Sequence, residues 1–267
     1  MGKRQIDKST VVGVMLAGAG VVAGLLLDGG TVRQILQPTA ALIVVGGTLG
    51  AVMIQFPMQT IRSTIKELRH ALLDAKPLNR ELVEELVSWC LQARRMGMLA
   101  LDAYLPQIAD PFFRKGMMLA VDGVGVRELR DTLEVDLDVW HEREAGVAKV
   151  LEAAGGFAPT LGIIGAVLGL IQVMQRMDNV GEIGKGIAVA FVSTLYGIGL
   201  ANLVFLPLAG KLKIRMRERQ LVREMTLEAV VSIMEGVSAR ALRQRLEAYL
   251  TEGPSEAQGR AEPEMTT

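Results

Sequence analysis

The sequence predicts an all-α, polytopic membrane protein with four transmembrane helices and a helical cytoplasmic domain. Three observations lead to this fold class: an apolar composition, four long stretches without charged residues, and an uneven distribution of basic residues between them. Half of the 267 residues are hydrophobic but only 4% are aromatic, and 29 are glycine. This composition suits helices in lipid better than the core of a soluble domain.

The four stretches without Asp, Glu, Lys, Arg or His predict the membrane spans. A helix rises about 1.5 Å per residue, and the hydrocarbon layer is about 30 Å thick, so each stretch is long enough to cross it. We therefore expect transmembrane helices over about 9–27, 34–56, 153–175 and 186–210.

The first stretch also has features of a signal peptide, because Lys3, Arg4 and Lys8 precede it and Ala17–Ala19 resembles a cleavage site. The apolar sequence continues beyond that site to Leu27. We therefore expect a retained membrane anchor.

The positions of the basic residues predict the orientation. If both termini are cytoplasmic, 26 of the 29 Lys and Arg residues lie on the cytoplasmic side, as the positive-inside rule requires. The outer loops, 28–33 and 176–185, are then short. The large loop over 62–152 and the C-terminal part face the cytoplasm.

The cytoplasmic segments read as helices. An apolar period follows Pro57, a second helix begins after Asn79, and a third runs from Val126 into the third span without a proline. In the second helix, Leu82, Val83, Leu86 and Leu91 are expected on one face. Residues 211–250 form a basic amphipathic stretch, which we expect to pack on the loop helices, with the membrane surface as the alternative. The last residues, 251–267, are expected to be disordered.

Several function classes are excluded by what the sequence lacks. There is no phosphate-binding loop and no Cys or His cluster, so we expect neither an enzyme nor a cofactor or metal site. The single cysteine, Cys90, is expected to be a buried structural thiol. The net charge is zero, so no nucleic-acid partner is expected.

The spans contain no ionisable side chain, although an ion path through hydrocarbon ordinarily needs one. If the protein conducts ions, a partner must supply the carboxylate. Helix four carries a polar strip, and helix three carries one hydroxyl; interhelical hydrogen bonding is the alternative role for them. These polar residues are Thr160, Ser193, Thr194, Tyr196 and Asn202.

Prolines and glycines mark possible flexible and close-packed points of the spans. Pro159 and Pro207 lie at similar depth in two antiparallel helices, and each can kink its helix. Glycines four residues apart allow helix backbones to approach closely. Such pairs are Gly20 and Gly24, Gly46 and Gly50, and Gly165 and Gly169.

Three segments resemble the MotA/PomA family of flagellar motor stator proteins: GGFAPTLGIIGAVLGLIQVM from Gly155, AFVSTLYGIGLANLVFLPLAGKL from Ala190, and ARRMGMLALD from Ala93. The resemblance covers nearly the whole chain. It implies a stator in the bacterial inner membrane, in which several copies surround a dimer of a MotB-type partner whose aspartate binds the ion. The rotor protein FliG is the implied partner of the loop.

The resemblance also implies roles for single residues. Pro159 and Pro207 match the family's coupling prolines, and Thr194 matches its threonine near the partner's aspartate. Thr194, together with Thr160, Ala166 and Tyr196, is expected to line the ion pathway. Arg94, Arg95 and Asp102 match rotor-facing positions, where relatives have Glu in place of Asp102.

At Ala166 the sodium-type relatives carry a threonine. Loss of that hydroxyl removes an oxygen ligand for Na⁺, so we expect H⁺ as the coupling ion. A sodium-driven PomA-type stator is one alternative. Another is an energiser of the ExbB or TolQ type, although these have one span before the large loop and this chain has two. A transporter or channel that acts alone would be expected to have an intramembrane charge or inverted repeats, and neither is evident in this sequence.

Overall fold

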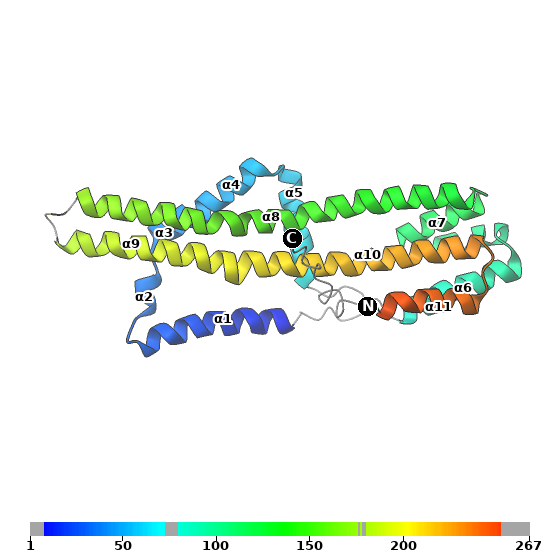
Figure 1. Cartoon of the computed structure of the whole chain (residues 1–267), viewed down its shortest axis with the longest axis horizontal. Helices are drawn as coiled ribbons and strands as arrows, with labels where there is room; N and C mark the ends of the chain where they lie inside the picture. Colours follow the sequence, from blue (N-terminus) through cyan, green and yellow to red (C-terminus); the bar gives the residue numbers. More distant parts are fainter. Residues whose placement is uncertain (1–7, 73–79, 176, 178–179, 252–267) are drawn as a thin grey trace, which may run out of the picture. The chain divides into compact units, whose positions relative to one another are not determined.

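The structure, a computed structural model, describes residues 8–72, 80–175, 177 and 180–251, and every regular element in these ranges is a helix (Figure 1). The chain divides into two compact units. We name residues 1–75 with 145–213 the apolar unit, and residues 76–144 with 214–267 the polar unit. Two helices, α8 (Val126–Gln175) and α10 (Leu206–Met234), contribute to both.

The apolar unit consists of helices of very different lengths, two of which, η1 and η3, are π-helical turns. The end of α8 and the start of α10 belong to it. Its other elements are α1 (Lys8–Leu27), α2 (Val32–Ile35), α3 (Pro38–Ala41), η1 (Leu42–Gly46), α4 (Gly47–Gln55), α5 (Met58–Leu72), α9 (Val180–Gly199) and η3 (Leu200–Phe205).

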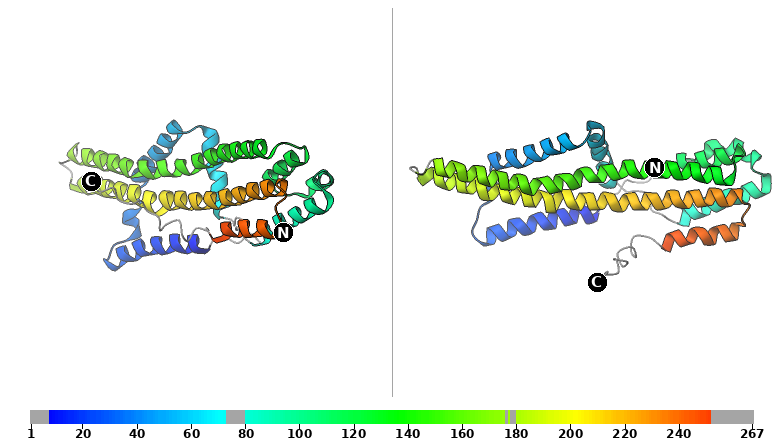
Figure 2. Two further views of the ribbon diagram at one scale, coloured as in Figure 1. Left: turned by 45° about the vertical axis from the view of Figure 1, so that its right-hand side comes forward. Right: turned by 45° about the horizontal axis from the view of Figure 1, so that its top comes forward.

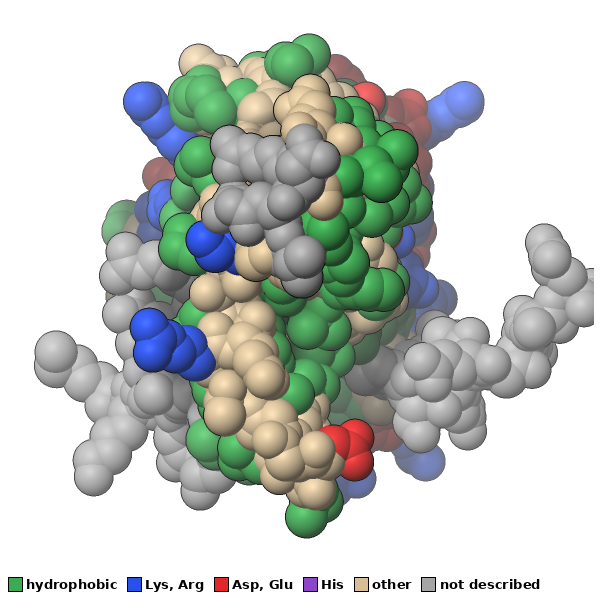
Figure 3. Space-filling view, turned by 90° about the vertical axis from the view of Figure 1, so that its left-hand side faces the viewer, with side chains coloured by type: hydrophobic (Ala, Val, Ile, Leu, Met, Phe, Trp, Pro, Cys, Tyr) green, Lys and Arg blue, Asp and Glu red, His purple; other side chains and the backbone are tan. Residues whose placement is uncertain are grey.

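Three helical segments of the described chain are long and apolar enough to cross a membrane: Pro38–Gln55, a part of Val126–Gln175, and a part of Ile183–Met234. They correspond to the second, third and fourth predicted spans. The first predicted span falls on α1, where Met15–Leu27 is a shorter apolar helix. Figure 3 shows one end of the apolar unit, where hydrophobic and uncharged side chains cover most of the visible face.

The two inner helices of the apolar unit, the end of α8 and α9, pack backbone against backbone (Figures 1 and 2). A Cβ atom added to Gly162 would lie 2.9 Å from the Ser193 carbonyl oxygen, and one added to Gly169 would lie 2.7 Å from the Gly186 carbonyl oxygen. On α9, a Cβ at Gly197 would lie 2.5 Å from the Ala158 carbonyl oxygen. We call this contact the glycine seam; only residues without side chains permit it.

The glycine pairs expected to support close packing behave differently from one another. Gly165 and Gly169 both face α9 in the seam. Cβ atoms added to Gly20, Gly24, Gly46 or Gly50 would meet nothing within 4 Å. Close packing within this chain therefore accounts for only the third pair.

The segment from α3 to α4 packs on the inner helices. Ala40, Val44 and Thr48 recur every four residues and are buried. A Cβ at Gly47 would lie 2.8 Å from Leu161 of α8. Before α3 the helix is broken, and the Tyr196 hydroxyl of α9 donates to the Ile35 carbonyl at 2.6 Å, so a side chain satisfies backbone that the break exposes.

The polar unit consists of α6 (Arg80–Met96), the 3₁₀ helix η2 (Leu99–Gln107), α7 (Pro111–Val121), the start of α8, the rest of α10, and α11 (Ala239–Thr251). One hydrophobic core joins all of them. Trp89 meets Phe113 edge to face at 5.9 Å, and the Arg223 guanidinium lies 4.3 Å from the centre of the Trp140 ring. Its largest fully buried side chains include Leu86, Leu101, Met117, Leu129, Leu133, Met225, Leu242 and Leu246.

Two expectations for the polar unit need correction. Leu91 is 42% exposed; the buried face of α6 runs through Val83, Leu86 and Cys90 instead. The stretch expected over 211–250 forms two helices, because Gly236 adopts φ +71° after α10, a conformation that L side chains rarely take. Both helices pack on the loop helices, and Cys90 is buried, as expected. Asn79 and residues 252–267 lie outside the described residues.

The glycine seam predicts a strong effect of a single methyl group. Gly197→Ala should lower the thermal unfolding midpoint of the detergent-purified protein by several degrees, since overpacking typically costs about 1–3 kcal/mol. Gly199→Ala is the matched control: it lies on the same helix, and its added Cβ meets nothing within 4 Å. Equal midpoints for the two variants would contradict the seam.

The core of the polar unit gives a second prediction. Leu133 is 0% exposed, so Leu133→Ala should destabilise this unit by about 2–5 kcal/mol. Both tryptophans lie in the polar unit, so tryptophan fluorescence during urea unfolding measures its stability directly. Val135→Ala, at a 61% exposed position on the same helix, should leave the urea midpoint nearly unchanged.

Candidate functional site

Of the predicted ion-pathway residues, Thr194 lies in the glycine seam, and the predicted coupling proline Pro159 lies there too. The backbone of Thr194 packs on Gly162, with the Thr194 Cα 3.3 Å from a Cβ built there. The Pro159 Cα lies 3.1 Å from a Cβ built on Gly197. The seam therefore brings together the backbones of Pro159 and Thr194, from α8 and α9, within about one helical turn of each other.

The hydroxyl groups of this region are mostly bonded to nearby backbone. Thr194 donates to the Ala190 carbonyl at 3.2 Å, and Thr160, which is exposed, donates to the Phe157 carbonyl at 2.8 Å. Asn202, also exposed, donates to the Ile198 carbonyl at 3.0 Å. Their acceptor lone pairs remain available to a ligand or a partner side chain.

Tyr196 lies differently from the other polar residues of α9. Its hydroxyl donates to the Ile35 carbonyl and accepts a hydrogen bond from the Gln37 amide at 3.4 Å. The side chain therefore points to the break between α2 and α3. In this arrangement its hydroxyl forms hydrogen bonds with the backbone at the break between α2 and α3.

Ala166 and Pro207 complete the membrane residues expected from the sequence. Ala166 lies half-buried on α8, one turn beyond Gly162, and brings no oxygen atom to the seam. Pro207 is exposed and follows the π-helical turn η3, whose last bond runs from the Leu206 amide to the Ala201 carbonyl. A π-turn beside a proline gives this helix a locally weak ladder of hydrogen bonds.

An ion pair that the sequence analysis did not identify lies near the two prolines. Lys213, six residues after Pro207, pairs with Glu152, seven residues before Pro159. Opposite charges at those offsets give no signal in a single sequence, because the pairing depends on how α8 and α10 align. Gly162 was also missed, although its spacing of three residues from Gly165 could have indicated the seam.

The expected rotor-facing residues lie on an exposed edge of the polar unit. Arg94 and Arg95 occupy the last turn of α6, Asp102 lies in η2, and all three are exposed. Gly97 joins the two helices with φ +82° and accounts for the tight reversal. Beneath this edge, burial raises the pKa of the Cys90 thiol, and the nearby charge of Arg94 lowers it in part.

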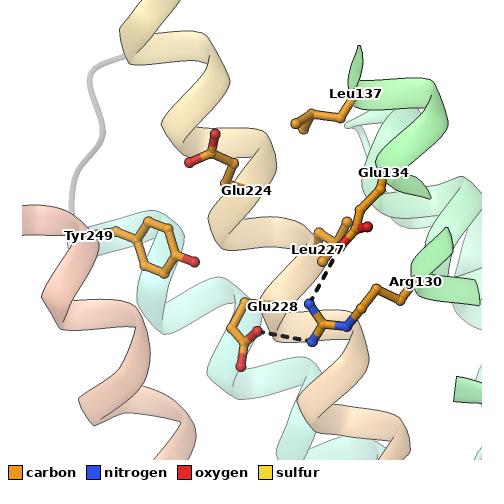
Figure 4. Close-up of a pocket in the computed structure, with 7 residues that line it drawn as sticks. All are labelled: Arg130, Glu134, Leu137, Glu224, Leu227, Glu228 and Tyr249. Carbon is orange, nitrogen blue, oxygen red and sulfur yellow. Dashed lines mark hydrogen bonds and ion pairs between the residues drawn. The ribbon is translucent and has the colours of Figure 1, made fainter. Parts of the chain in front are cut away.

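A second charged cluster lines a pocket elsewhere in the polar unit (Figure 4). Arg130 lies 3.4 Å from Glu228 and 3.7 Å from Glu134. Glu224 and Tyr249 face the same space. The acids are balanced by arginines, since Arg245 also bonds Glu228 at 3.1 Å. The described residues hold no group of His, Cys, Asp and Glu suited to a metal ion.

Comparison with known families identifies two matching models. Residues 105–225 match the MotA/TolQ/ExbB proton channel family, and residues 11–96 match the motility protein A N-terminal model. Together they cover both units and most of the chain.

Individual proteins match over nearly their whole length. The chain is 35% identical to motility protein A of Bacillus subtilis over 246 residues, which are 92% of this chain and 91% of that protein. It is 33% identical to chemotaxis protein PomA of Vibrio alginolyticus over 93% of this chain and 97% of that one.

Solved structures agree with these matches. The C. jejuni MotAB structure aligns with a TM-score of 0.87 and 29% identity, over 92% of this chain and 97% of the other. The flagellar MotAB stator complex of Bacillus subtilis aligns with a TM-score of 0.84 and 36% identity, over 91% and 96%. This chain therefore belongs to the MotA/TolQ/ExbB proton channel family, in its motility protein A group.

Proposed function

We propose that this chain is a stator subunit of the bacterial flagellar motor and that, with a MotB-type partner, it converts proton flow into torque on the rotor. Nearly full-length similarity to motility protein A and to a flagellar stator complex carries the proposal. An ExbB- or TolQ-type energiser is not favoured, because the relatives that cover nearly the whole chain are motility proteins. The family is one of proton channels rather than of enzymes.

The partner supplies the ion-binding carboxylate. The predicted spans contain no ionisable side chain, and a conducting path through hydrocarbon needs one. The two solved relatives are MotAB complexes, which supports a MotB-type partner for this chain. Several copies of the chain surround a dimer of that partner.

Four spans hold the protein in the inner membrane with both termini in the cytoplasm. Three apolar helices of sufficient length support this arrangement, and α1 supplies the first span. The placement of 26 of the 29 basic residues on the cytoplasmic side supports the orientation.

The coupling ion is H⁺. A dehydrated Na⁺ needs several oxygen ligands, whereas a proton moves along water and hydroxyl groups. One turn beyond Gly162, Ala166 contributes a methyl group instead of a hydroxyl. The absence of this oxygen ligand supports proton transfer to the partner's carboxylate.

Torque requires two arrangements of the chain. One must be more stable when the partner's carboxylate is protonated and the other when it is charged. Pro159 lies in the seam against Gly197, and Pro207 lies beside a π-turn, so each marks a place where a helix can bend. Bending there moves the polar unit, whose edge of Arg94, Arg95 and Asp102 then pushes on charges of FliG. Exposed pairs are worth about 1 kcal/mol or less, so they suit repeated contact and release.

The coupling ion can be tested by motility. In a strain that lacks this gene, we expect flagellated but non-motile cells, and complementation should restore a swimming speed that does not change with sodium at fixed proton-motive force. Swimming speed by video tracking is the measurement. A speed that rises with sodium would contradict the role given to Ala166. Normal swimming of the deletion strain would require a second stator, which deletion of other stator genes would reveal.

The rotor contact can be tested by charge reversal. Arg94→Glu and Asp102→Lys should each slow swimming several-fold, and combining each with a reversed charge on FliG should restore much of the speed. Arg80→Glu is the matched control: it is exposed on the same helix, about 20 Å from Arg94 along the axis. An equal loss for Arg80→Glu would show that the edge has no special role.

A further inference from the structure

One buried polar group of the glycine seam has no hydrogen-bond partner. Ser193, on α9, is 0% exposed, and its buried hydroxyl oxygen forms no hydrogen bond. It lies next to Thr194 in the chain but on the side of α9 that faces α8. The proposed ion pathway makes no use of it.

Three other hydroxyls of the apolar unit are paired by a bond within their own helix. Thr48 donates to the Val44 carbonyl at 2.6 Å, Thr64 to the Thr60 carbonyl at 2.9 Å, and Thr194 to the Ala190 carbonyl, each four residues earlier. The same option exists for Ser193 at Val189. Its hydroxyl instead points across the seam.

The group that Ser193 faces is a glycine. A Cβ built on Gly165 would lie 2.6 Å from the Ser193 Oγ and 2.7 Å from its Cβ, so any side chain at Gly165 would displace the serine. The same Cβ would lie 3.4 Å from the Cγ2 of Ile43, in the π-turn η1. Ser193 therefore lies where α8, α9 and η1 meet.

An unpaired buried hydroxyl costs free energy, and an alanine would fill the same space without that cost. A second arrangement of the helices in which the hydroxyl is paired would offset this cost. We propose that Ser193 is a latch, whose hydroxyl is unpaired in this arrangement and donates to a backbone carbonyl of α8 in a second one. Ser193 is thus a positioning residue that stabilises the second arrangement.

The seam offers the hydroxyl of Ser193 backbone carbonyl groups that no side chain covers. Glycines at 162, 165 and 169 leave the backbone of α8 without side chains on the face toward α9. A slide of one residue, about 1.5 Å along the axis, or a small rotation brings a carbonyl beside Gly162 or Gly165 to the hydroxyl. The π-turn η1, a kind of turn that is rare and frequently found at functional sites, lies at the same point.

The role of Ser193 as a latch goes beyond the proposed function. Only the rotation measurement below depends on the proposed function being correct. The test compares Ser193→Ala with wild type in a strain without other stators, by the rotation speed of a small bead on a flagellar stub, at low load. We expect at least a twofold lower speed, because the second arrangement loses its hydrogen bond. The purified stator complex should keep or raise its thermal midpoint, because the resting arrangement loses an unpaired group.

Thr48→Val is the matched control, since it removes a buried hydroxyl that is already bonded within its own helix. Its low-load speed should equal that of wild type. An unchanged speed for Ser193→Ala would overturn the latch, and so would a thermal midpoint several degrees lower, which would mean that the hydroxyl is bonded at rest. A wild-type chain that drives no rotation would overturn the proposed function instead, and the thermal midpoint would still test the unpaired state.

Discussion

The direct backbone contact between α8 and α9 is the constraint on which the rest of the apolar unit depends. Gly162, Gly169 and Gly197 meet carbonyl groups at distances that leave no room for a Cβ atom. In lipid, where no hydrophobic effect drives helices together, this close packing supplies the attraction. The positions of Pro159, Thr194 and Ser193 all follow from it.

The two units are held together by different kinds of packing. The described residues of the seam are glycines and other uncharged residues, packed backbone against backbone. The polar unit has a continuous core of aliphatic and aromatic side chains, with Arg223 stacked on Trp140 and Phe112, where burial lowers the pKa of the arginine. A well-packed core transmits a displacement instead of absorbing it.

Hydrophobic pattern and charge predicted the helices well, because both are local properties of the sequence. The long helix from Val126 and the packing of residues after Lys211 on the loop helices are present in the structure. The break at Leu36–Gln37 was not predicted, since the Tyr196 hydroxyl, about 160 positions away, satisfies the exposed backbone. The side chain of Ser193 faces α8, and Lys213 pairs with Glu152, because of how the helices align. The pattern of residues in a single sequence does not reveal that alignment.

The contact made by Tyr196 has a consequence for sequence variation. Its phenol recognises the carbonyl of Ile35 and the amide of Gln37, groups that every residue except proline at the second position provides. The side chains at those two positions can therefore change during evolution without loss of these hydrogen bonds. The tyrosine keeps the outer segment bonded to α9. The outer helices of a distant relative could therefore keep this hydrogen-bonded joint with different side chains at these two positions, whereas the packing of Ala40, Val44 and Thr48 on the inner helices depends on side-chain size.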